Sequence, residues 1–311
     1  MLCGKGLEVV LVSAPRNIHS QGGEWANSRH LLADQGVRLI VADRADSQEI
    51  LDLINDVTMG FSHGAPWIFG APLIDYFGGR LLNYHPTRLP LMRGGGSHSW
   101  RIMMGDARGA FTIHLIDNGL DTGEIVRTHE FEYPKDLRLP EDFMHWEQET
   151  GLGFLSEFFD DVIAQKSFSP KVQDSRRGTY FPRLNTGIHA AVDWSWKAEQ
   201  IERFICAFDK PYIGAFTYIG NRRVRLKDCR VAELGIEFHP FQCGLIVRLD
   251  SGSPYVVCRD GLLLIGEVLD EHSFEHIALA LGDRLHTPRE DLDKAMATRV
   301  KYTPRGMKAL S

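Results

Sequence analysis

The stretch Arg80-Leu81-Leu82-Asn83-Tyr84-His85-Pro86 joins a short apolar run to polar side chains in the first half of the chain. An apolar run of this length, bounded by turn residues, is typical of a strand buried in a sheet. Similar runs occur on both sides of it, separated by helical patterns, at residues 7–12, 37–41, 57–62 and 110–117. Alternating strands and helices predict an α/β domain with a parallel sheet. We expect this domain to cover residues 1–170.

A change in charge and pattern marks the second half of the chain. Residues 1–175 contain 15 Lys and Arg against 24 Asp and Glu, a net charge of −9, whereas residues 176–311 contain 20 against 17, a net charge of +3. A polar stretch with Pro and Gly at residues 165–178 suits a linker between domains. Beyond it, one helical pattern precedes several short apolar runs with turn signals. We therefore expect a small β-barrel domain at residues 178–311.

The overall composition excludes several classes of protein. The 311 residues suffice for about two domains, and 43% hydrophobic and 24% charged residues are ordinary for a globular chain. The net charge of −6 argues against a general nucleic-acid coat. The sequence contains neither an apolar run long enough to span a membrane nor the pattern of a signal peptide. Five scattered cysteines argue against a disulfide framework, so we expect a cytoplasmic protein.

Three side chains at strand ends indicate chemistry. Asn83 and His85 are two positions apart at the end of a strand, so their side chains share one face. Asp121 follows the strand at residues 110–117. This strand can be a neighbour of the strand that carries Asn83 and His85, because one helix joins the two. An imidazole can accept the proton of an amine, an amide can stabilise an oxyanion, and a carboxylate can orient the imidazole. These residue types suit acyl transfer to an amine, although a lone His or Asp at a strand end more often has a structural role.

Two motifs together carry a resemblance to a known family. The string Asn83-Tyr84-His85-Pro86-Thr87-Arg88-Leu89-Pro90-Leu91-Met92-Arg93-Gly94, followed at this spacing by Asn118-Gly119-Leu120-Asp121-Thr122-Gly123, resembles the folate-dependent formyltransferases. The resemblance implies a Rossmann-like catalytic domain in which Asn83, His85 and Asp121 are catalytic. It also implies N10-formyltetrahydrofolate as the formyl donor, with no metal. Residues 192–194 and 211–218 look like the opening of the family's second domain, which implies an OB-like barrel.

The chain departs from the family pattern in two places. Family members usually begin with one more strand and helix before the run at residues 7–12, and residues 2–6 resemble the end of that helix. Thr87 replaces the commoner Ser and keeps its hydroxyl, whereas Arg88 stands where Leu is usual. The departure at Arg88 leaves the substrate contacts of this position open.

The resemblance also places the two ligands. The pterin of the folate is expected against the backbone of two loops, with packing at a helix start as the alternative role for the aromatic residues. These loops contain Ala65, Pro66, Trp67, Ile68, Phe69, Ile116, Asp117, Gly119 and Leu120. The guanidinium of Arg93 can grip a phosphate or carboxylate of the acceptor, with a surface salt bridge as its alternative. The acceptor is thus expected beside Thr87, Arg88, Arg93 and Gly94.

Other polar and aromatic side chains are expected to be structural. His98, His114 and His129 lack the spacing of metal ligands, so we expect core or solvated histidines and no metal site. The aromatic residues between positions 143 and 158 fit one buried face of a helix.

Within the family, the chain resembles most the N-formyltransferases that act on nucleotide-linked amino sugars. The expected acceptor is the amine of a nucleotide-linked amino deoxysugar, as in lipopolysaccharide and O-antigen biosynthesis, and such relatives are often homodimers. Methionyl-tRNA formyltransferase is the main alternative, but residues 15–24 contain one Arg and one Glu where the tRNA enzyme has a basic insertion. A formyltetrahydrofolate hydrolase and a non-catalytic binding module are the remaining alternatives. A sugar acceptor implies neither a nucleic-acid partner nor a membrane partner.

Overall fold

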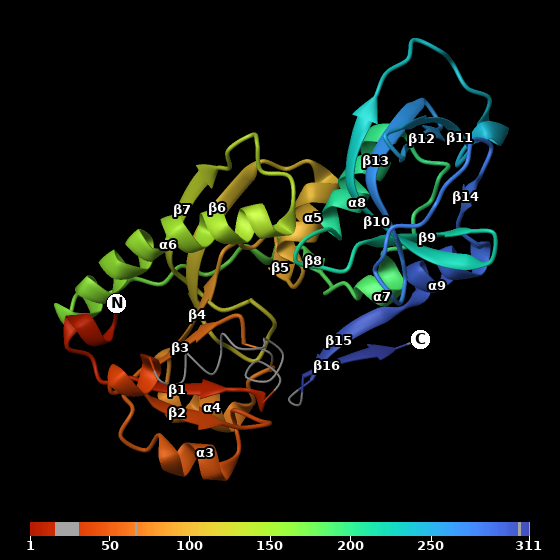
Figure 1. Cartoon of the computed structure of the whole chain (residues 1–311). Helices are drawn as coiled ribbons and strands as arrows, with labels where there is room; N and C mark the ends of the chain where they lie inside the picture. Colours follow the sequence, from red (N-terminus) through yellow and green to blue (C-terminus); the bar gives the residue numbers. More distant parts are fainter. Residues whose placement is uncertain (16–30, 66, 304–305, 311) are drawn as a thin grey trace.

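The computed structural model describes residues 1–15, 31–65, 67–303 and 306–310. Figure 1 shows an N-terminal lobe, coloured red to yellow, and a C-terminal lobe, coloured green to blue. The sequence also predicts a helix at residues 24–34, closed by Gly36. Residues 24–30 lie outside the described residues, and residues 31–34 are helical. Within the described ranges, no helix is long and apolar enough to cross a membrane.

The N-terminal lobe contains two sheets. In the first, β1 (Val10–Ser13) and β2 (Arg38–Val41) form a parallel pair. The strands of the second sheet are, in order, β3 (Gly60–His63), β4 (Leu81–His85), β6 (Arg108–Leu115) and β7 (Ile125–Glu132). β3 and β4 are parallel, whereas β6 is antiparallel to both β4 and β7. The lobe is therefore a mixed α/β structure.

The predicted parallel arrangement is correct for β1–β2 and β3–β4 but wrong for the strand at residues 110–117. A parallel neighbour requires a crossover that carries the chain back across the sheet. Between β4 and β6 the chain instead passes through a loop and the short helix α5 (Ser97–Met104). This helix packs against α8 (Ala198–Ala207) of the second lobe. The chain consequently enters β6 beside the end of β4 and runs antiparallel to it.

Alternation along β4 sends its side chains to two different cores. Leu81 packs in a cluster with residues of α3 (Gln48–Leu53) and α4 (Ala71–Phe77). Leu82 and Tyr84 pack instead against α6 (Pro140–Ile163), which buries its aromatic residues as predicted. Because side chains alternate along a strand, Asn83 and His85 share the face of Leu81. The alternation along β4 therefore agrees with the prediction that these two side chains lie on one face.

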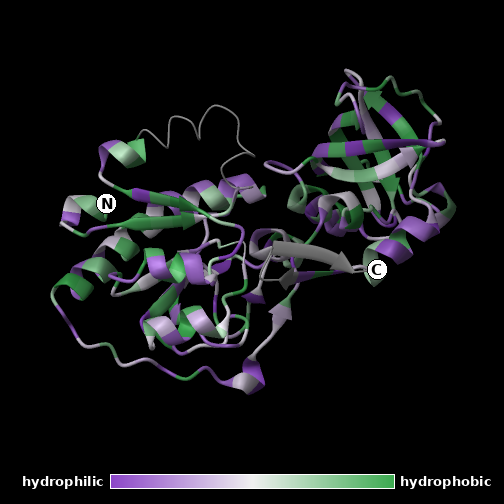
Figure 2. Ribbon diagram, turned by 90° about the horizontal axis from the view of Figure 1, so that it is seen from below, coloured by the Kyte–Doolittle hydropathy of each residue, from purple (hydrophilic) through white to green (hydrophobic). Residues whose placement is uncertain are grey.

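The C-terminal lobe is built on one antiparallel sheet. Its strands are, in order, β11 (Ile246–Asp250), β12 (Ser253–Cys258), β13 (Gly261–Asp270), β10 (Arg222–Ala232), β9 (Ala215–Ile219) and β14 (Leu285–His286). The sheet curls, because a backbone bridge between Leu245 and Arg284 brings its two ends together. Hydrophobic and hydrophilic residues alternate along its strands (Figure 2).

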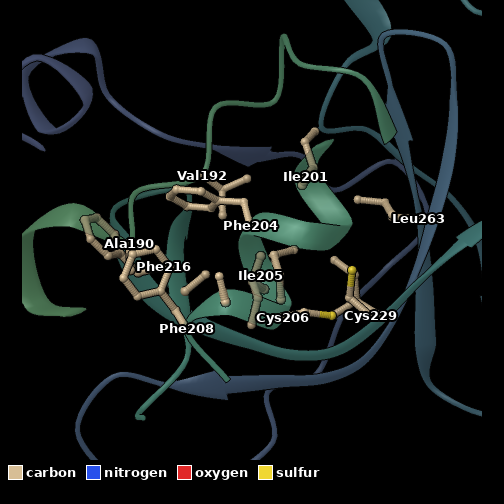
Figure 3. Close-up of a cluster of buried hydrophobic side chains, with 14 of the residues drawn as sticks. Ala190, Val192, Ile201, Phe204, Ile205, Cys206, Phe208, Phe216, Cys229 and Leu263 are labelled. Carbon is tan, nitrogen blue, oxygen red and sulfur yellow. The ribbon is translucent and has the colours of Figure 1, made fainter. Parts of the chain in front are cut away.

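Helix α8 supplies much of the core of this lobe. Its residues Ile201, Phe204 and Ile205 are buried together with Phe208 and Leu263 (Figure 3). Leu292 and Ala295 of α9 (Arg289–Ala297) pack against this core. The lobe also contains α7 (Thr186–His189) and the hairpin of β15 (Arg299–Thr303) and β16 (Gly306–Leu310). Short 3-10 helices lie at Cys3–Lys5, Ser175–Arg177 and Pro240–Gln242.

The two lobes are joined next to the end of β4. β5 (Arg93–Gly94), in the loop after β4, pairs in parallel with β8 (Tyr180–Phe181), which follows the predicted linker at residues 165–178. The indole Nε1 of Trp100 in α5 donates to the Pro182 carbonyl at 2.7 Å. These contacts place the entry to the C-terminal lobe beside the carboxyl ends of the central strands.

Candidate active site

A cavity of about 710 Å³ opens where β3 and β4 end. Small-molecule sites are typically about 300–1,000 Å³, and in α/β sheets they collect at the carboxyl ends of strands. The N-terminal lobe contributes most of the lining, and the chain that enters the C-terminal lobe contributes Arg183, Leu184, Thr186, Phe208 and Tyr212. Both lobes therefore shape the candidate site.

The three predicted catalytic residues line this cavity, and a histidine joins them. Asn83 Nδ2 lies 3.2 Å from His114 Nε2. His85 Nε2 lies 3.0 Å from the Met92 carbonyl oxygen and 3.8 Å from Asp121 Oδ2. The other carboxylate oxygen, Asp121 Oδ1, lies 3.6 Å from His114 Nε2. The structure thus brings Asn83, His85 and Asp121 together as predicted, although their catalytic role stays a prediction.

The hydrogen bonds determine which ring nitrogens carry protons. His114 Nδ1 lies 2.7 Å from the Leu115 carbonyl, so it donates there, and Nε2 accepts from the Asn83 amide. His85 Nε2 likewise donates to the Met92 carbonyl. His85 Nδ1 has no partner among the described residues and is left as a basic nitrogen. One N–H of the Asn83 amide is likewise left for a ligand, because the group has two.

Asp121 reaches this site although β6 runs antiparallel to β4. The chain turns back after β6, because Asp117 Oδ1 accepts from Gly119 N at 3.0 Å and from Thr122 Oγ1 at 2.6 Å. Asp121 itself adopts a left-handed φ of +53°, which Asp tolerates better than most residues. Its backbone oxygen accepts from Gln173 Nε2 at 3.0 Å. The predicted proximity to His85 is therefore produced by the return of the loop and not by parallel strands.

The charge state of Asp121 follows from its surroundings. Burial raises the pKa of this carboxyl, but the positive charge available at His85 and the hydrogen bond from the amide of Gly94 lower it to about 2. The Gly94 amide donates to Asp121 Oδ2 at 2.8 Å. At Gly94, where φ is +99°, a Cβ would stand 2.1 Å from the Phe181 oxygen, so only glycine fits. Asp121 is consequently ionised at neutral pH and faces His85.

The two loops assigned to folate line the same cavity as Asn83, His85 and Asp121. Eight of their residues line the cavity, namely Ala65, Trp67, Ile68, Phe69, Ile116, Asp117, Gly119 and Leu120. Pro66 lies outside the described residues. Trp67 also has the packing role given as its alternative, because its Nε1 donates to the Asp43 carbonyl at 2.8 Å. Folate binding by these loops stays a prediction.

Of the residues assigned to the acceptor, Gly94 alone lines the cavity. The Thr87 hydroxyl is fully buried and donates to the Met92 carbonyl at 3.0 Å. Arg88 forms an ion pair with Asp106. Arg93 donates through Nε and Nη2 to Gln173 Oε1 at 3.1 and 2.8 Å. The structure does not bring Thr87, Arg88 and Arg93 to the acceptor, because their polar groups already have protein partners around the loop after β4.

Sequence reasoning missed several polar residues of the cavity, among them His114, Arg183, His98 and Glu147. His114, expected to be a core or solvated histidine, is 2% exposed and contacts Asn83 and Asp121. It does so because the antiparallel register pairs it with Asn83, and nothing in the sequence reveals that register. Arg183 is exposed, lines the cavity and has no hydrogen bond or ion pair among the described residues. Its place after Pro182, just beyond the predicted linker, gave no functional signal.

Comparison with known families agrees with this arrangement. The formyl transferase family matches residues 47–136, which contain the three predicted catalytic residues, and the C-terminal domain of formyl transferases matches residues 188–275. The two matches together cover more than half of the chain. The chain belongs to the folate-dependent formyltransferases, a family of enzymes that transfer formyl groups from formyl-tetrahydrofolate.

Two curated relatives differ in how much of them the chain covers. A cytosolic 10-formyltetrahydrofolate dehydrogenase of Xenopus tropicalis is 29% identical over 200 residues, which are 64% of this chain and 21% of the relative. The chain thus spans about a fifth of that protein. A methionyl-tRNA formyltransferase of Ruminiclostridium cellulolyticum is 25% identical over 280 residues, which are 86% of each chain.

Solved structures share the fold at low sequence identity. HypX of Aquifex aeolicus, in complex with tetrahydrofolic acid, has 18% identity and a TM-score of 0.55, and the match covers 88% of this chain and 45% of HypX. The N-formyltransferase of Helicobacter canadensis, in complex with folinic acid and dTDP-3-aminofucose, has 18% identity and a TM-score of 0.54. That match covers 84% of this chain and 100% of the other. At this identity the likeness concerns the fold.

Proposed function

We propose that this chain transfers the formyl group of N10-formyltetrahydrofolate to the amine of a nucleotide-linked amino deoxysugar. The observation that carries the proposal is the arrangement of Asn83, His85 and Asp121 in a cavity bounded by the loops assigned to folate. On this proposal, residues 1–170 form the catalytic domain. Residues 178–311 form an OB-like domain whose entry segment completes the acceptor side.

His85 is the base in this proposal. The amine must lose a proton as it attacks the formyl carbon, and His85 Nδ1 is the ring nitrogen left without a protein partner. The bond between the formyl carbon and N10 of the folate then breaks, and His85 gives its proton to N10. Asp121 faces Nε2 of the same ring at 3.8 Å, so the positive charge that His85 gains is stabilised by an ionised carboxylate.

Asn83 stabilises the negative charge that develops on the formyl oxygen. His114 accepts from the Asn83 amide at 3.2 Å and thereby fixes the orientation of the amide. The second N–H of the same group is then available to the oxyanion. This division of labour gives His114 a positioning role in the reaction.

In this proposal, the loops at residues 65–69 and 116–120 hold the folate. Their backbone groups offer hydrogen bonds to the pterin, and the hydrogen bond from Trp67 to Asp43 fixes the first loop. A preformed site of this kind aligns the formyl group with His85, which is the main requirement of a transfer between two bound substrates.

Arg183 is the cation that we assign to the phosphates of the acceptor. It is the single Lys or Arg among the described residues that line the cavity. One guanidinium suits a diphosphate, whereas a tRNA acceptor requires many phosphate contacts.

One observation favours the second candidate, methionyl-tRNA formyltransferase. The relative with that activity matches 86% of this chain and 86% of its own length, a more complete match than the dehydrogenase gives. The two candidates share the formyl donor and the roles of Asn83, His85 and Asp121. They differ in the acceptor, and therefore in the dependence on salt.

An assay against salt separates the two candidates. We expect turnover with formyl-tetrahydrofolate and at least one of a panel of UDP-, dTDP- and GDP-linked amino sugars, with kcat/KM nearly constant between 50 and 200 mM salt. Binding to charged initiator tRNA would weaken by ~10³–10⁵ over that range if it made ~6–10 phosphate contacts. Tight tRNA binding at physiological salt, with no turnover of any amino-sugar nucleotide, would reverse the choice. Turnover with water alone would instead identify a hydrolase.

A further inference from the structure

A second group of polar side chains lines the cavity and is not used by the proposed mechanism. It consists of His98 at the start of α5, Glu147 on α6, Tyr133 after β7 and Tyr84 in β4, and we call it the Glu147 cluster. His98, Glu147 and Tyr84 all line the cavity. Glu147 is 8% exposed, so its carboxylate is largely removed from bulk water. A buried carboxylate is stable only when hydrogen bonds or an opposite charge compensate for the loss of water.

Glu147 fixes the orientation of His98. His98 Nε2 lies 3.0 Å from Glu147 Oε2, and the Tyr133 hydroxyl donates to Glu147 Oε1. Each carboxylate oxygen therefore has one protein donor, and the proton of a neutral His98 is on Nε2. His98 Nδ1 is then an acceptor, and it has no partner in the part of the chain that the structure describes.

The hydroxyl of Tyr84 is closed to a ligand. Tyr84 is 4% exposed, and its hydroxyl is buried without a hydrogen-bond partner among the described residues. The hydroxyl approaches α6 at Gly151, one turn after Glu147, where a Cβ would stand 2.6 Å from the oxygen. Burial and the negative charge of Glu147 raise the pKa of Tyr84, so the phenol keeps its proton. The open group of the cluster is therefore Nδ1 of His98.

The cluster lies on a different wall from the loops assigned to folate. His98 is four residues after Gly94, whose amide holds Asp121, so at most about 14 Å of backbone separates it from that contact. Glu147 and Gly151 come from α6, whereas the folate loops follow β3 and β6. A ligand on this wall is within reach of the reacting atoms without occupying the folate loops.

We propose that the Glu147 cluster selects the acceptor by binding a hydroxyl group of its sugar ring. The ring hydroxyl donates its hydrogen to His98 Nδ1. Glu147 and Tyr133 do not touch the sugar and act as positioning residues, because they hold His98 in the tautomer that accepts. This inference rests on the proposed function, since it concerns the acceptor in the same cavity.

The test compares variants of the cluster with matched variants nearby. His98→Gln removes the contact to the hydroxyl, and Glu147→Gln removes the charge that orients His98. The controls are Glu149→Gln and His145→Gln, which make the same chemical changes at exposed positions of α6. Each protein is assayed with formyl-tetrahydrofolate and the best acceptor of the amino-sugar panel, beginning with dTDP-3-aminofucose. Binding of folinic acid and the melting temperature are measured in parallel.

We expect the KM for the acceptor to rise about tenfold in His98→Gln and Glu147→Gln, as for the loss of a hydrogen bond to substrate. Folinic acid binding and both controls should match the wild-type protein. Removing the relevant ring hydroxyl from the acceptor, in single deoxy analogues, should raise the wild-type KM by a similar factor. The same analogue should cost His98→Gln much less, because the partner is already gone. A structural role of His98 would not produce this coupling.

Three results overturn the inference. Acceptor KM values in the cluster variants equal to those of the controls overturn it while leaving the proposed function intact. Weakened folinic acid binding with an unchanged acceptor KM assigns the cluster to the donor side. Failure of the wild-type protein to formylate any amino-sugar nucleotide overturns the proposed function, and the inference with it. If Glu147→Gln does not fold, His98→Gln decides alone, because His98 is the residue that touches the sugar.

Discussion

Two pairs of an imidazole and a carboxylate line the same cavity, and they are built differently. His85 and Asp121 approach no closer than 3.8 Å, and each is anchored to the backbone, at Met92 and at Gly94 respectively. His98 and Glu147 are joined directly at 3.0 Å, and the carboxylate is further fixed by Tyr133. The first pair lies at strand ends and loops, whereas the second lies on two helices.

The difference indicates what each pair can do. A pair that is close but not bonded can tighten when charge develops, and apo active sites often have such long contacts. A pair that is already bonded presents a fixed pattern of donors and acceptors, which suits recognition of a ligand. We therefore expect substitutions of the first pair to lower kcat and substitutions of the second pair to raise the KM for the acceptor.

The largest effect should come from breaking the first pair. His85→Gln and Asp121→Asn should each lower kcat by about 10³–10⁴-fold, because the base and the charge that supports it act on the reacting atoms. Folinic acid binding should stay within about twofold of the wild-type value, because the loops assigned to folate are unchanged. His129→Gln, at an exposed position on β7, is the control. Steady-state kinetics with near-normal kcat in both variants would exclude the catalytic assignment.

Removal of the proposed oxyanion donor should have the next largest effect. Asn83→Ala should lower kcat by about 10²–10³-fold, as for other oxyanion-hole donors. His114 orients the Asn83 amide by accepting one of its hydrogens. His114→Gln should therefore also lower kcat, but by a smaller factor than Asn83→Ala. The measurement is kcat with saturating substrates, and Asn221→Ala, in an exposed turn, is the control. A loss confined to KM would move Asn83 from the reaction to binding.

The ionised state of Asp121 should be visible in stability as well. Its pKa of about 2 is below the ordinary value of 3.8, so its charge stabilises the fold above about pH 4, and this contribution is lost as the pH falls through 2. The free energy of urea unfolding of the wild-type protein relative to Asp121→Asn should therefore fall by about 1 kcal/mol between pH 6 and pH 3. A difference that does not change with pH would mean that Asp121 has an ordinary pKa.

The smallest effect is expected from a change beside the second pair, His98 and Glu147. Tyr133→Phe removes one of the two donors to Glu147 and leaves His98 bonded, so the KM for the acceptor should rise only about two- to fivefold. This is less than the effect expected for Glu147→Gln. Tyr255→Phe, in the C-terminal sheet, is the control. A larger effect from Tyr133→Phe than from Glu147→Gln would show that Tyr133 itself touches the acceptor.

Sequence reasoning succeeded where a local rule decides the geometry. Asn83 and His85 share a face because side chains alternate along a strand, and this holds whatever the strand pairs with. The loop at residues 65–69, assigned to folate, lines the cavity because it follows the carboxyl end of β3. The loop at residues 116–120 also lines the cavity, although it follows the antiparallel β6. The reasoning failed for Arg93, because a polar side chain in a loop is available to a ligand only if no protein group has bonded it. Gln173, eighty positions later, had done so.

The sequence by itself determined the strands and helices, the family motifs and the pair Asn83 and His85, because these depend on residues that are neighbours along the chain. Tertiary structure alone decided that β6 runs antiparallel, which pairs His114 with Asn83 and makes Asp121 depend on a returning loop. It also decided that His98 and Glu147, 49 positions apart, meet at one wall of the cavity. Contacts of this kind depend on how helices and strands pack over long separations, and no local pattern of residues records that packing.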